Sequence, residues 1–349
     1  MKVVQIGGRL VGDGQPCFTA AEVGINHNGD INLAHRSIDA AADAGADAIK
    51  FQNYRTEDFV SDRSLSYEYI SQGQKVCESQ YDMFKRCELN RDQLRELREH
   101  CERRGVIFFS TPTSESGIRD LVDMGAPLLK NGSDYLIHLP LIRAMALSGL
   151  PTVLSTGMAE ENEIKDAVEA FRGAGGKNLI LLHCTSSYPT PPVDVHLRKI
   201  GTLAHVFDCP VGLSDHSQGT IAAVGSIALG CCMIEKHFTL DRSLPGPDHS
   251  FSADPTEFRL LVESIRILES NLGTPNLGPA DSETVGRRKY RLSCVAAREL
   301  SAGHSLTLSD VAFRKPGIGF PPKDRDRLIA RKLARGVMSG HVFSGEDFA

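Results

Sequence analysis

Titratable side chains recur at the ends of short apolar segments along this sequence. Five of them are Glu22, Lys50, Lys130, His216 and His237. If the segments are parallel strands that close into a barrel, their ends meet on one rim, and barrel enzymes carry their chemistry there. The pattern therefore predicts one shared site rather than scattered surface polarity.

Two of these side chains, Lys50 and Lys130, would offer two cations on neighbouring strand ends. Further strand ends add hydroxyl donors and glycines that permit close backbone approach: Ser133, Ser155, Ser214, Gly132 and Gly157. This combination favours a small carboxylate or phosphate as ligand. The alternative for each lysine is a solvated surface charge, which is less compatible with Lys50 because it directly follows the apolar pair Ala48-Ile49.

The histidines His216 and His237 fall on the seventh and eighth predicted strands. Two imidazoles with open coordination positions suit a divalent ion such as manganese, zinc or iron; hydrogen-bonded structural histidines are the alternative. Closure of the barrel would bring Glu22 beside His237, where it could act as general acid or base, or else form a buried ion pair. Glu235 shares a strand face with His237 and is interpreted as a supporting or core residue.

These side chains need a scaffold of alternating strands and helices. The candidate strands are Cys17–Val23, Ala48–Gln52, Val106–Ser110, Pro127–Asn131, Thr152–Ser155, Leu179–His183, Val211–Ser214 and Met233–His237. Amphipathic segments between them, such as Asn90–Arg104, predict helices. Nearly continuous apolar strands, each followed by a helix, indicate an α/β fold with a parallel sheet. Eight such units predict a (β/α)8 TIM barrel.

Other segments lie outside this repeating unit. The opening Lys2–Val11 predicts a hairpin that plugs the bottom of the barrel, and the polar Thr56–Glu88 predicts a long functional loop. The predicted domains are a barrel over 1–272, a linker over 273–288 that is rich in Gly, Pro and polar residues, and a small β-rich domain over 289–349. In the last, Gly303-His304 with Asp310 recurs 37 residues later as Gly340-His341 with Asp347, which predicts a duplicated unit.

Composition excludes several classes of protein. The net charge is −5, from 39 basic and 44 acidic residues without a basic stripe, which argues against nucleic acid as a partner. Apolar stretches are too short to cross a membrane, and the start lacks the apolar core of a signal peptide. The nine cysteines form no CxxC pair, which is typical of reduced thiols and predicts a cytoplasmic protein.

The ordered motifs resemble the sialic acid synthase family, which includes N-acetylneuraminate, legionaminate, pseudaminate and spore-coat relatives. They are AEVGINHNG at 21–29, KFQ at 50–52, FSTP at 109–112, LSTGM at 154–158, LHCTSSYPTP at 182–191, GLSDH at 212–216, IEKHFT at 234–239 and PGPD at 245–248. The tail resembles the family's antifreeze-like, or SAF, domain. The resemblance implies condensation of phosphoenolpyruvate with an N-acyl mannosamine-type sugar, giving a nonulosonate and phosphate.

The resemblance also implies a role for particular residues. They are the catalytic Glu22; the metal ligands His216 and His237; the phosphoenolpyruvate contacts Lys50, Lys130, Ser133, Ser155, Ser186 and Ser214; and the sugar contacts Gln52, Tyr188, Asp248 and Lys315. Manganese is the expected ion, with magnesium and cobalt as alternatives. The family further implies a domain-swapped homodimer in which a turn of the tail covers the partner's site.

Three positions depart from the family pattern. Ser186 stands where relatives often have asparagine, which bears on the phosphate contact, and Asp134-Tyr135 replaces a Gly-Glu pair, which bears on sugar choice. Lys315 replaces an arginine, whose fork an amine does not reproduce, although Arg314 precedes it. The acceptor could instead be a 2,4-diacetamido-trideoxy hexose, as in legionaminate or pseudaminate synthases.

Other activities fit less of the chain. Phosphoenolpyruvate-condensing synthases of the shikimate or octulosonate pathways lack a tail like 289–349. A non-catalytic carbohydrate-binding or antifreeze protein leaves the polar strand ends unexplained. A metal-dependent barrel hydrolase normally needs more than two protein ligands to its metal.

Overall fold

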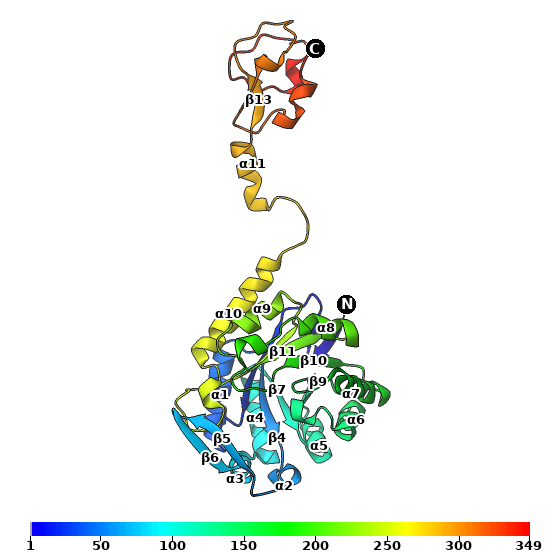
Figure 1. Ribbon diagram of the computed structural model, residues 1–349, viewed down its shortest axis with the longest axis vertical. Helices are drawn as coiled ribbons and strands as arrows, with labels where there is room; N and C mark the ends of the chain where they lie inside the picture. The colour runs from blue at the N-terminus through cyan, green and yellow to red at the C-terminus, as the bar shows by residue number, and fades with distance from the viewer. Residues whose placement is uncertain (1) are drawn as a thin grey trace. The chain divides into compact units, whose positions relative to one another are not determined.

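Eight parallel strands close into a barrel in this computed structural model, which describes residues 2–349 (Figure 1). Around the barrel they follow the order β10-β11-β12-β3-β4-β7-β8-β9. Their bounds are β3 (Phe18–Gly24), β4 (Ala48–Asn53), β7 (Ile107–Pro112), β8 (Leu129–Asn131), β9 (Thr152–Ser155), β10 (Leu179–Cys184), β11 (Val211–Asp215) and β12 (Met233–His237). The predicted (β/α)8 barrel is confirmed, and the strand ends differ from the predicted ones by at most two residues.

A ring of helices covers the outer face of the strands. These helices are α1 (Ile31–Asp43), α4 (Arg91–Arg103), α5 (Glu115–Asp123), α6 (Leu139–Leu147), α7 (Glu161–Gly173), α8 (Lys199–Phe207), α9 (Ile221–Ile227) and α10 (Pro255–Leu272). Asp254 caps α10 by accepting a hydrogen bond from the backbone N–H of Glu257, with Pro255 in the first turn. Among residues 2–349, no helix has both the length and the hydropathy that a membrane span requires.

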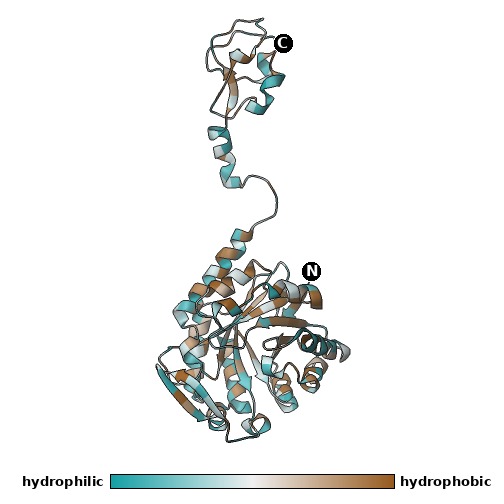
Figure 2. Cartoon of the chain, viewed as in Figure 1, coloured by the Kyte–Doolittle hydropathy of each residue, from teal (hydrophilic) through white to brown (hydrophobic). Residues whose placement is uncertain are grey.

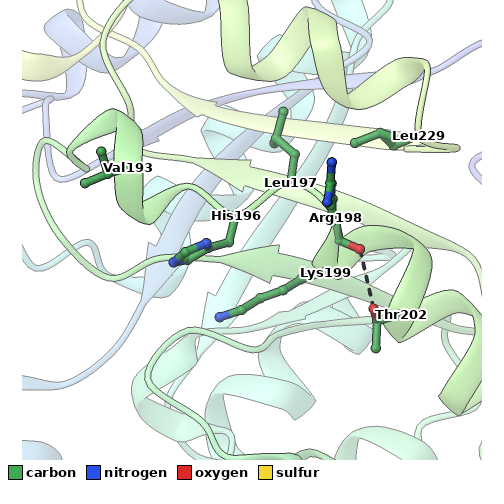
Figure 3. A pocket seen from close by; sticks show the side chains of 7 residues that line it. All are labelled: Val193, His196, Leu197, Arg198, Lys199, Thr202 and Leu229. Atoms are coloured by element: carbon green, nitrogen blue, oxygen red, sulfur yellow. Dashed lines mark hydrogen bonds between the residues drawn. The ribbon is translucent and has the colours of Figure 1, made fainter.

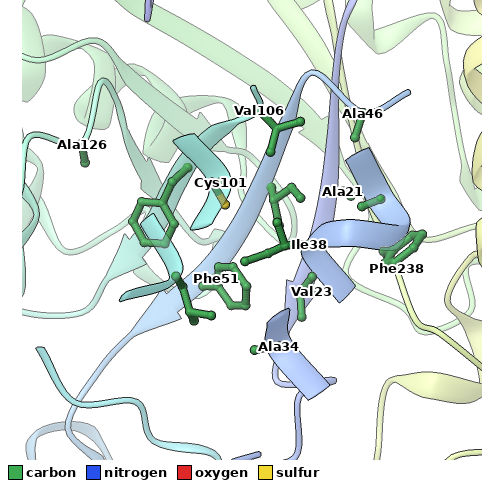
Figure 4. Packing of buried hydrophobic residues seen from close by; sticks show 14 of the residues in the cluster. Ala21, Val23, Ala34, Ile38, Ala46, Phe51, Cys101, Val106, Ala126 and Phe238 are labelled. Atoms are coloured by element: carbon green, nitrogen blue, oxygen red, sulfur yellow. The ribbon is translucent and has the colours of Figure 1, made fainter. Parts of the chain in front are cut away.

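The barrel strands are apolar on both faces because both faces are covered, the outer one by the helices and the inner one by the side chains of the other strands. Every residue of β3 is buried, and the strands are coloured mostly hydrophobic in Figure 2. Val23 of β3 and Phe51 of β4 point outward and pack against Ala34 and Ile38, which lie four residues apart on one face of α1 (Figure 4). The inward-facing residues at the carboxyl ends of the same strands are therefore free to be polar.

The first two strands close one end of the barrel. β1 (Val3–Ile6) and β2 (Arg9–Gly12) pair as an antiparallel hairpin. Its buried side chains Val4, Ile6 and Val11 pack with inward-facing apolar residues of the barrel, including Phe109. The predicted plug is confirmed, and the polar chemistry is left to the opposite end.

The segment between β4 and α4 is more ordered than the loop that its polar composition predicted. It forms α2 (Thr56–Phe59), the antiparallel strands β5 (Ser66–Ser71) and β6 (Gln74–Ser79), and α3 (Gln80–Cys87). Figure 1 shows this insert at the barrel end opposite the first hairpin. Aromatic residues spaced along the insert form a small core with Tyr54 and Met83. Composition alone did not predict this core, because exposed polar residues alternate with partly buried ones along β5.

The chain divides into two compact units, the first ending at Gly273 and the second beginning at Thr274. The predicted linker is partly helical, since α11 spans Thr284–Tyr290. The second unit has its own apolar core around Leu306, Leu333 and Phe343. Its regular strands are β13 (Ser293–Ala296) and β14 (Val311–Arg314), which pair antiparallel.

The sequence repeat of the second unit is also a repeat of contacts. His304 Nε2 lies 2.9 Å from Asp310 Oδ2, and His341 Nε2 lies 2.9 Å from Asp347 Oδ2. Arginines placed 37 residues apart complete each set, because Arg298 and Arg335 each lie 2.7 Å from the second carboxylate oxygen of their aspartate. Both aspartate side chains are fully buried. The duplication therefore preserves a buried, hydrogen-bonded carboxylate.

The second unit should lose stability in acid because of these carboxylates. Burial alone would raise the pKa of Asp347, but hydrogen bonds from Ser344, His341 and Arg335 lower it to about 2. A depressed pKa stabilises the folded state above the unfolded value near 4, and the stabilisation disappears as pH falls from about 4 toward 2. We expect Asp347→Asn to destabilise this unit by about 2 kcal/mol at neutral pH and to weaken the acid dependence.

Hydrogen-exchange protection factors of peptides within 294–349, measured in the full chain between pH 6 and pH 3, would check this. Asp326→Asn is the matched control, because the Asp326 side chain is 80% exposed. Equal loss of protection in the two variants would contradict the assignment.

Candidate active site

The carboxyl ends of the barrel strands surround a cavity of about 550 Å³. All of the sequence-predicted site residues except Lys315 line it: Glu22, Lys50, Gln52, Lys130, Ser133, Ser155, Ser186, Tyr188, Ser214, His216, His237 and Asp248. Lys315 belongs to the second unit, where its Nζ lies 5.4 Å from the centre of the Tyr290 ring, and its role in sugar binding stays a prediction. The scaffold thus brings together residues separated by more than 200 positions.

A cluster of four buried charged groups forms the floor of this cavity. Lys50 Nζ lies 3.2 Å from Glu22 Oε2 and 3.1 Å from Glu235 Oε2. Lys130 Nζ lies 3.5 Å from Glu235 Oε1 and donates a hydrogen bond of 2.8 Å to Ser155 Oγ. The interpretation of Glu235 as a supporting or core residue is therefore too weak, because its carboxylate bridges the two lysines and lines the cavity.

The two glutamates of the cluster differ in their protonation. Burial would raise the pKa of Glu235, but Lys130, Lys50 and the Ser214 hydroxyl lower it to about 2. Burial of Glu22, together with the negative charge of Glu235, raises the pKa of Glu22 to about 7, although the nearby Lys50 acts in the opposite direction. Glu235 is therefore the fixed anion, and Glu22 can exchange a proton near neutrality, which a general acid or base requires.

The pKa values of the two lysines are shifted in opposite directions. Burial alone would lower the pKa of Lys50, but the carboxylates of Glu22 and Glu235 raise it above its usual range. Burial lowers the pKa of Lys130 more than Glu235 raises it. An added anion would favour the charged form of Lys130.

The two histidines lie side by side at the rim of the cavity. Their ring centres are 5.3 Å apart, and barrel closure places His237 next to Glu22 in strand register, as predicted. His216 Nδ1 donates to the Thr185 carbonyl at 2.9 Å, which leaves Nε2, 3.4 Å from Ser214 Oγ, as the nitrogen that carries the lone pair. The Tyr188 ring lies 4.2 Å from that of His216, centre to centre.

These histidines fit the divalent ion that the sequence predicts. His237 Nδ1 is buried without a hydrogen-bond partner and lies 3.7 Å from Asp248 Oδ2. Burial lowers the pKa of His237 well below its usual range, so the ring is neutral, the form that a metal ligand must have. Among residues 2–349, no set of three or more His, Cys, Asp or Glu side chains is arranged to hold a metal.

A buried ion pair connects the two strands that carry the histidines. Lys236 Nζ lies 2.8 Å from Asp215 Oδ2 and donates to the Ser217 carbonyl at 2.7 Å. Asp215 Oδ1 also accepts from the Ser217 hydroxyl and backbone N–H. Each partner directly precedes one histidine in sequence, so this network fixes the relative positions of the two rings.

Hydroxyl groups crowd around Gly157, which follows β9. Ser133 Oγ accepts a hydrogen bond of 3.0 Å from the Gly157 N–H, and Ser186 Oγ is buried without a partner. A Cβ atom at position 157 would lie only 2.4 Å from Ser186 Oγ and 2.7 Å from Ser133 Oγ. Glycine is thus required for the hydroxyls to approach, and Ser186 has a hydrogen bond left to offer a ligand.

Sequence reasoning missed part of the lining. The aromatic residues Tyr54, Phe59 and Phe84 line the cavity, as does Thr111, whose hydroxyl is buried without a partner. Thr111 is the third residue of the FSTP motif, for which the sequence predicted no individual role. The three aromatic residues belong to none of the motifs. Their position depends on the folding of the insert, which composition did not reveal.

A second hollow of about 670 Å³ lies where β10 connects to α8. Val193, His196, Leu197, Arg198, Lys199, Thr202 and Leu229 line it (Figure 3). The hydrogen bond drawn there joins the Thr202 hydroxyl to the Arg198 carbonyl within one turn of chain. Since it contains none of the predicted site residues, the chemistry is assigned to the cavity at the strand ends.

Comparisons with known proteins agree with this geometry. The model of the NeuB family matches residues 37–276. The N,N'-diacetyllegionaminic acid synthase of Legionella pneumophila is 37% identical, over 94% of this chain and 94% of that protein. The human N-acetylneuraminate-9-phosphate synthase is 35% identical, over 93% of this chain and 91% of that protein.

A solved structure extends the likeness to three dimensions. The N-acetylneuraminic acid synthetase of Leptospira borgpetersenii, crystallised with citrate, superposes with a TM-score of 0.74 at 36% identity, covering 82% of this chain and 95% of that one. The family match spans the strands that carry Lys50, Lys130, Glu235 and the histidine pair, and it begins after β3, which carries Glu22. The chain therefore belongs to the NeuB family and is a synthase of sialic-acid-like nonulosonate sugars.

Proposed function

We propose that this enzyme condenses phosphoenolpyruvate with the open-chain aldehyde of an N-acyl mannosamine-type sugar, releasing phosphate. One observation carries the proposal: the buried cluster of Lys50, Lys130, Glu22 and Glu235 shares a cavity with the His216–His237 pair. Such a cluster is costly to bury, and its perturbed pKa values are typical of functional sites. The pair and the cluster would hold two reactants against each other.

The phosphoenolpyruvate site is proposed around the lysines and the hydroxyls near Gly157. Lys50 and Lys130 supply positive charge, and Ser133, Ser155, Ser186 and Ser214 supply hydrogen bonds. An incoming anion would favour the charged forms of Lys50 and Lys130. The lysines then oppose the charge of the phosphate that leaves.

In the proposed reaction, C3 of phosphoenolpyruvate forms a bond to the aldehyde carbon, whose oxygen takes up a proton. The C2 atom becomes electron-poor and accepts water, from which Glu22 removes a proton. Phosphate leaves by cleavage of its C2–O bond while the new hydroxyl on C2 loses its proton, which forms the keto group. A divalent ion held by His216 and His237, with manganese expected and magnesium or cobalt as alternatives, would polarise the aldehyde.

The sugar is proposed to contact Gln52, Tyr188 and Asp248, which line the cavity beside the histidines. Burial raises the pKa of Asp248 to about 6, against the opposing effect of His216, so this carboxyl can accept or donate a hydrogen bond near neutrality. The relatives differ in the product that they are named for: one carries two acetyl groups and another a phosphate at the far end of the sugar. A legionaminate- or pseudaminate-type acceptor is the second candidate.

The second unit is proposed to be the antifreeze-like domain that covers the site of a partner subunit in a homodimer, with Lys315 reaching the sugar. The resemblance of the tail supports this proposal. A cytoplasmic location is proposed as well, because all nine cysteines are free thiols.

Phosphate release from phosphoenolpyruvate tests the reaction. We expect release only when both manganese and a suitable acyl-amino sugar are present, with N-acetylmannosamine, its 6-phosphate and 2,4-diacetamido-2,4,6-trideoxymannose supplied separately. A chelator should abolish release and added manganese restore it, because the ion polarises the aldehyde. Failure of all three sugars in metal-loaded enzyme, or release without any sugar, would refute the proposed reaction.

A further inference from the structure

The loop between β12 and α10, residues 238–252, carries Asp248 to the cavity. The Asp248 side chain lines the cavity, and its Oδ2 lies 3.7 Å from His237 Nδ1. The proposed reaction uses only Glu22 and Asp248 of the two motifs AEVGINHNG and PGPD. Other residues of these motifs, which lie more than 200 positions apart, contact each other in and around this loop.

The next residue of the loop, His249, is buried with both ring nitrogens engaged. Its Nδ1 lies 2.7 Å from Thr239 Oγ1, and its Nε2 lies 3.2 Å from Asn28 Nδ2. The Thr239 hydroxyl donates its one proton to the Asp241 carbonyl, so it accepts a hydrogen bond from Nδ1–H, and Nε2 accepts from the Asn28 amide. Burial lowers the pKa of His249 to about 4, so the ring is in this neutral form at neutral pH.

The Asn28 amide, from the loop after β3, holds the residues on both sides of Asp248. Its Nδ2 donates a hydrogen bond of 2.7 Å to the Pro245 carbonyl in addition to its contact with His249. Between them, Gly246 has a φ of +145°, and a Cβ atom there would lie 2.9 Å from Asn28 Oδ1. Glycine is therefore required for the amide and the loop to approach this closely.

A second amide fixes the backbone of Asp248 itself. The Asp248 carbonyl accepts a hydrogen bond of 2.6 Å from Ser252 Oγ, which in turn accepts one of 2.9 Å from Asn26 Nδ2. The same Nδ2 donates to the carbonyl of Phe238, the residue after His237. The loop is thus tied to the strand end that carries the histidine, through side chains that do not line the cavity.

We propose that Asn28 and His249 are positioning residues that hold the Asp248 carboxyl beside the histidine pair and thereby set the affinity for the acceptor sugar. This inference rests on the proposed function, in which Asp248 contacts the sugar. Among residues 2–349, the ion-pair contact of this carboxylate is His237 alone, at 3.7 Å. The loop backbone, rather than a salt bridge, therefore determines where the carboxylate lies, and Asn28 and His249 hold that backbone.

Asn28→Gly in the full-length, manganese-loaded enzyme tests the proposal. Asn28 has a φ of +51°, which glycine adopts without strain, so the change removes only the amide. Kinetics use whichever of N-acetylmannosamine, its 6-phosphate and 2,4-diacetamido-2,4,6-trideoxymannose supports phosphate release. We expect the KM for that sugar to rise about tenfold, because misplaced binding groups are costly. The KM for phosphoenolpyruvate and the manganese affinity should change less than about twofold.

Two further measurements separate positioning from loss of stability. If Asn28 acts through Asp248, the double variant Asn28→Gly/Asp248→Ala should bind the sugar within about twofold of Asp248→Ala alone. Amides in 244–253 of Asn28→Gly should exchange with solvent at least about tenfold faster than in the wild type, without any substrate present. Asn90→Ala is the control, because it removes the N-cap of the outer helix α4 and leaves the loop untouched.

Each outcome decides the proposal. Unchanged hydrogen exchange in 244–253 would overturn the hold of Asn28 on the loop. An unchanged KM for the sugar, additive losses in the double variant, or the same rise in KM in Asn90→Ala would overturn its role for Asp248. Absence of phosphate release from the wild type with every sugar would refute the proposed reaction instead, and with it the sugar-binding role, while hydrogen exchange would still show whether Asn28 holds the loop.

Discussion

Replacing His237 by alanine is expected to abolish turnover while the barrel stays folded. Its Nδ1 is buried without a hydrogen-bond partner, and burial lowers the pKa of the ring well below its usual range, so removal of this neutral ring leaves no uncompensated charge. Loss of one of the two imidazoles should release the proposed divalent ion, which would supply several kcal/mol of stabilisation to the developing alkoxide. A loss of about 4 kcal/mol of transition-state stabilisation corresponds to a kcat that is about a thousandfold lower.

Three measurements on this variant separate chemistry from folding. Phosphate release reports turnover, manganese titration reports ion binding, and thermal unfolding reports the fold. His35→Ala is a control, because His35 pairs with Glu96 on the outer helices and does not line the cavity. Wild-type turnover or undiminished manganese affinity in the His237 variant would remove the metal assignment.

Glu22→Gln is expected to keep phosphoenolpyruvate binding and lose rate. The amide preserves the shape of the side chain beside Lys50 but cannot accept the proton of the attacking water. General acid–base groups typically contribute about a hundredfold to ten-thousandfold, so kcat should fall within that range. Calorimetric titration with phosphoenolpyruvate, run beside the rate assay, separates the two effects; a rate near that of the wild type would exclude this role.

The pH profile of the same variant gives a sharper signature. Burial, together with the charge of Glu235, raises the pKa of Glu22 to about 7. Because the base acts in its deprotonated form, wild-type activity should rise with pH through that region, and the rise should be absent in Glu22→Gln. An unchanged acidic limb in the variant would assign the titration to another group.

The floor of the cavity explains why this arrangement is a site and not a structural ion-pair network alone. Lys50 and Lys130 pair with the carboxylates of the cluster. The hydroxyls of Thr111, Thr113 and Ser186 in the same cavity, however, are buried without a hydrogen-bond partner. Buried polar atoms are normally satisfied, so a concentration of unsatisfied ones indicates a ligand that completes them.

Much of this protein could be predicted from its sequence because the relevant signals are local. Apolar runs of strand length that alternate with helical segments gave the barrel, since strands covered on both faces must be apolar along their whole length. The rim residues followed from the same rule, because the carboxyl ends of parallel strands meet. Closure of the ring then predicted that Glu22 lies beside His237, as the strand register shows.

Only the tertiary structure decided how these groups act on one another. Glu235 bridges Lys50 and Lys130 through distances of 3 to 4 Å between side chains from different strands. The pKa of Glu22 lies near neutrality because the fold buries this carboxyl beside Glu235. The aromatic lining of Tyr54, Phe59 and Phe84 likewise exists only because the insert packs against the end of β4. Composition and periodicity report the surroundings of one element at a time, whereas pKa values and pocket shape arise between elements far apart in the chain.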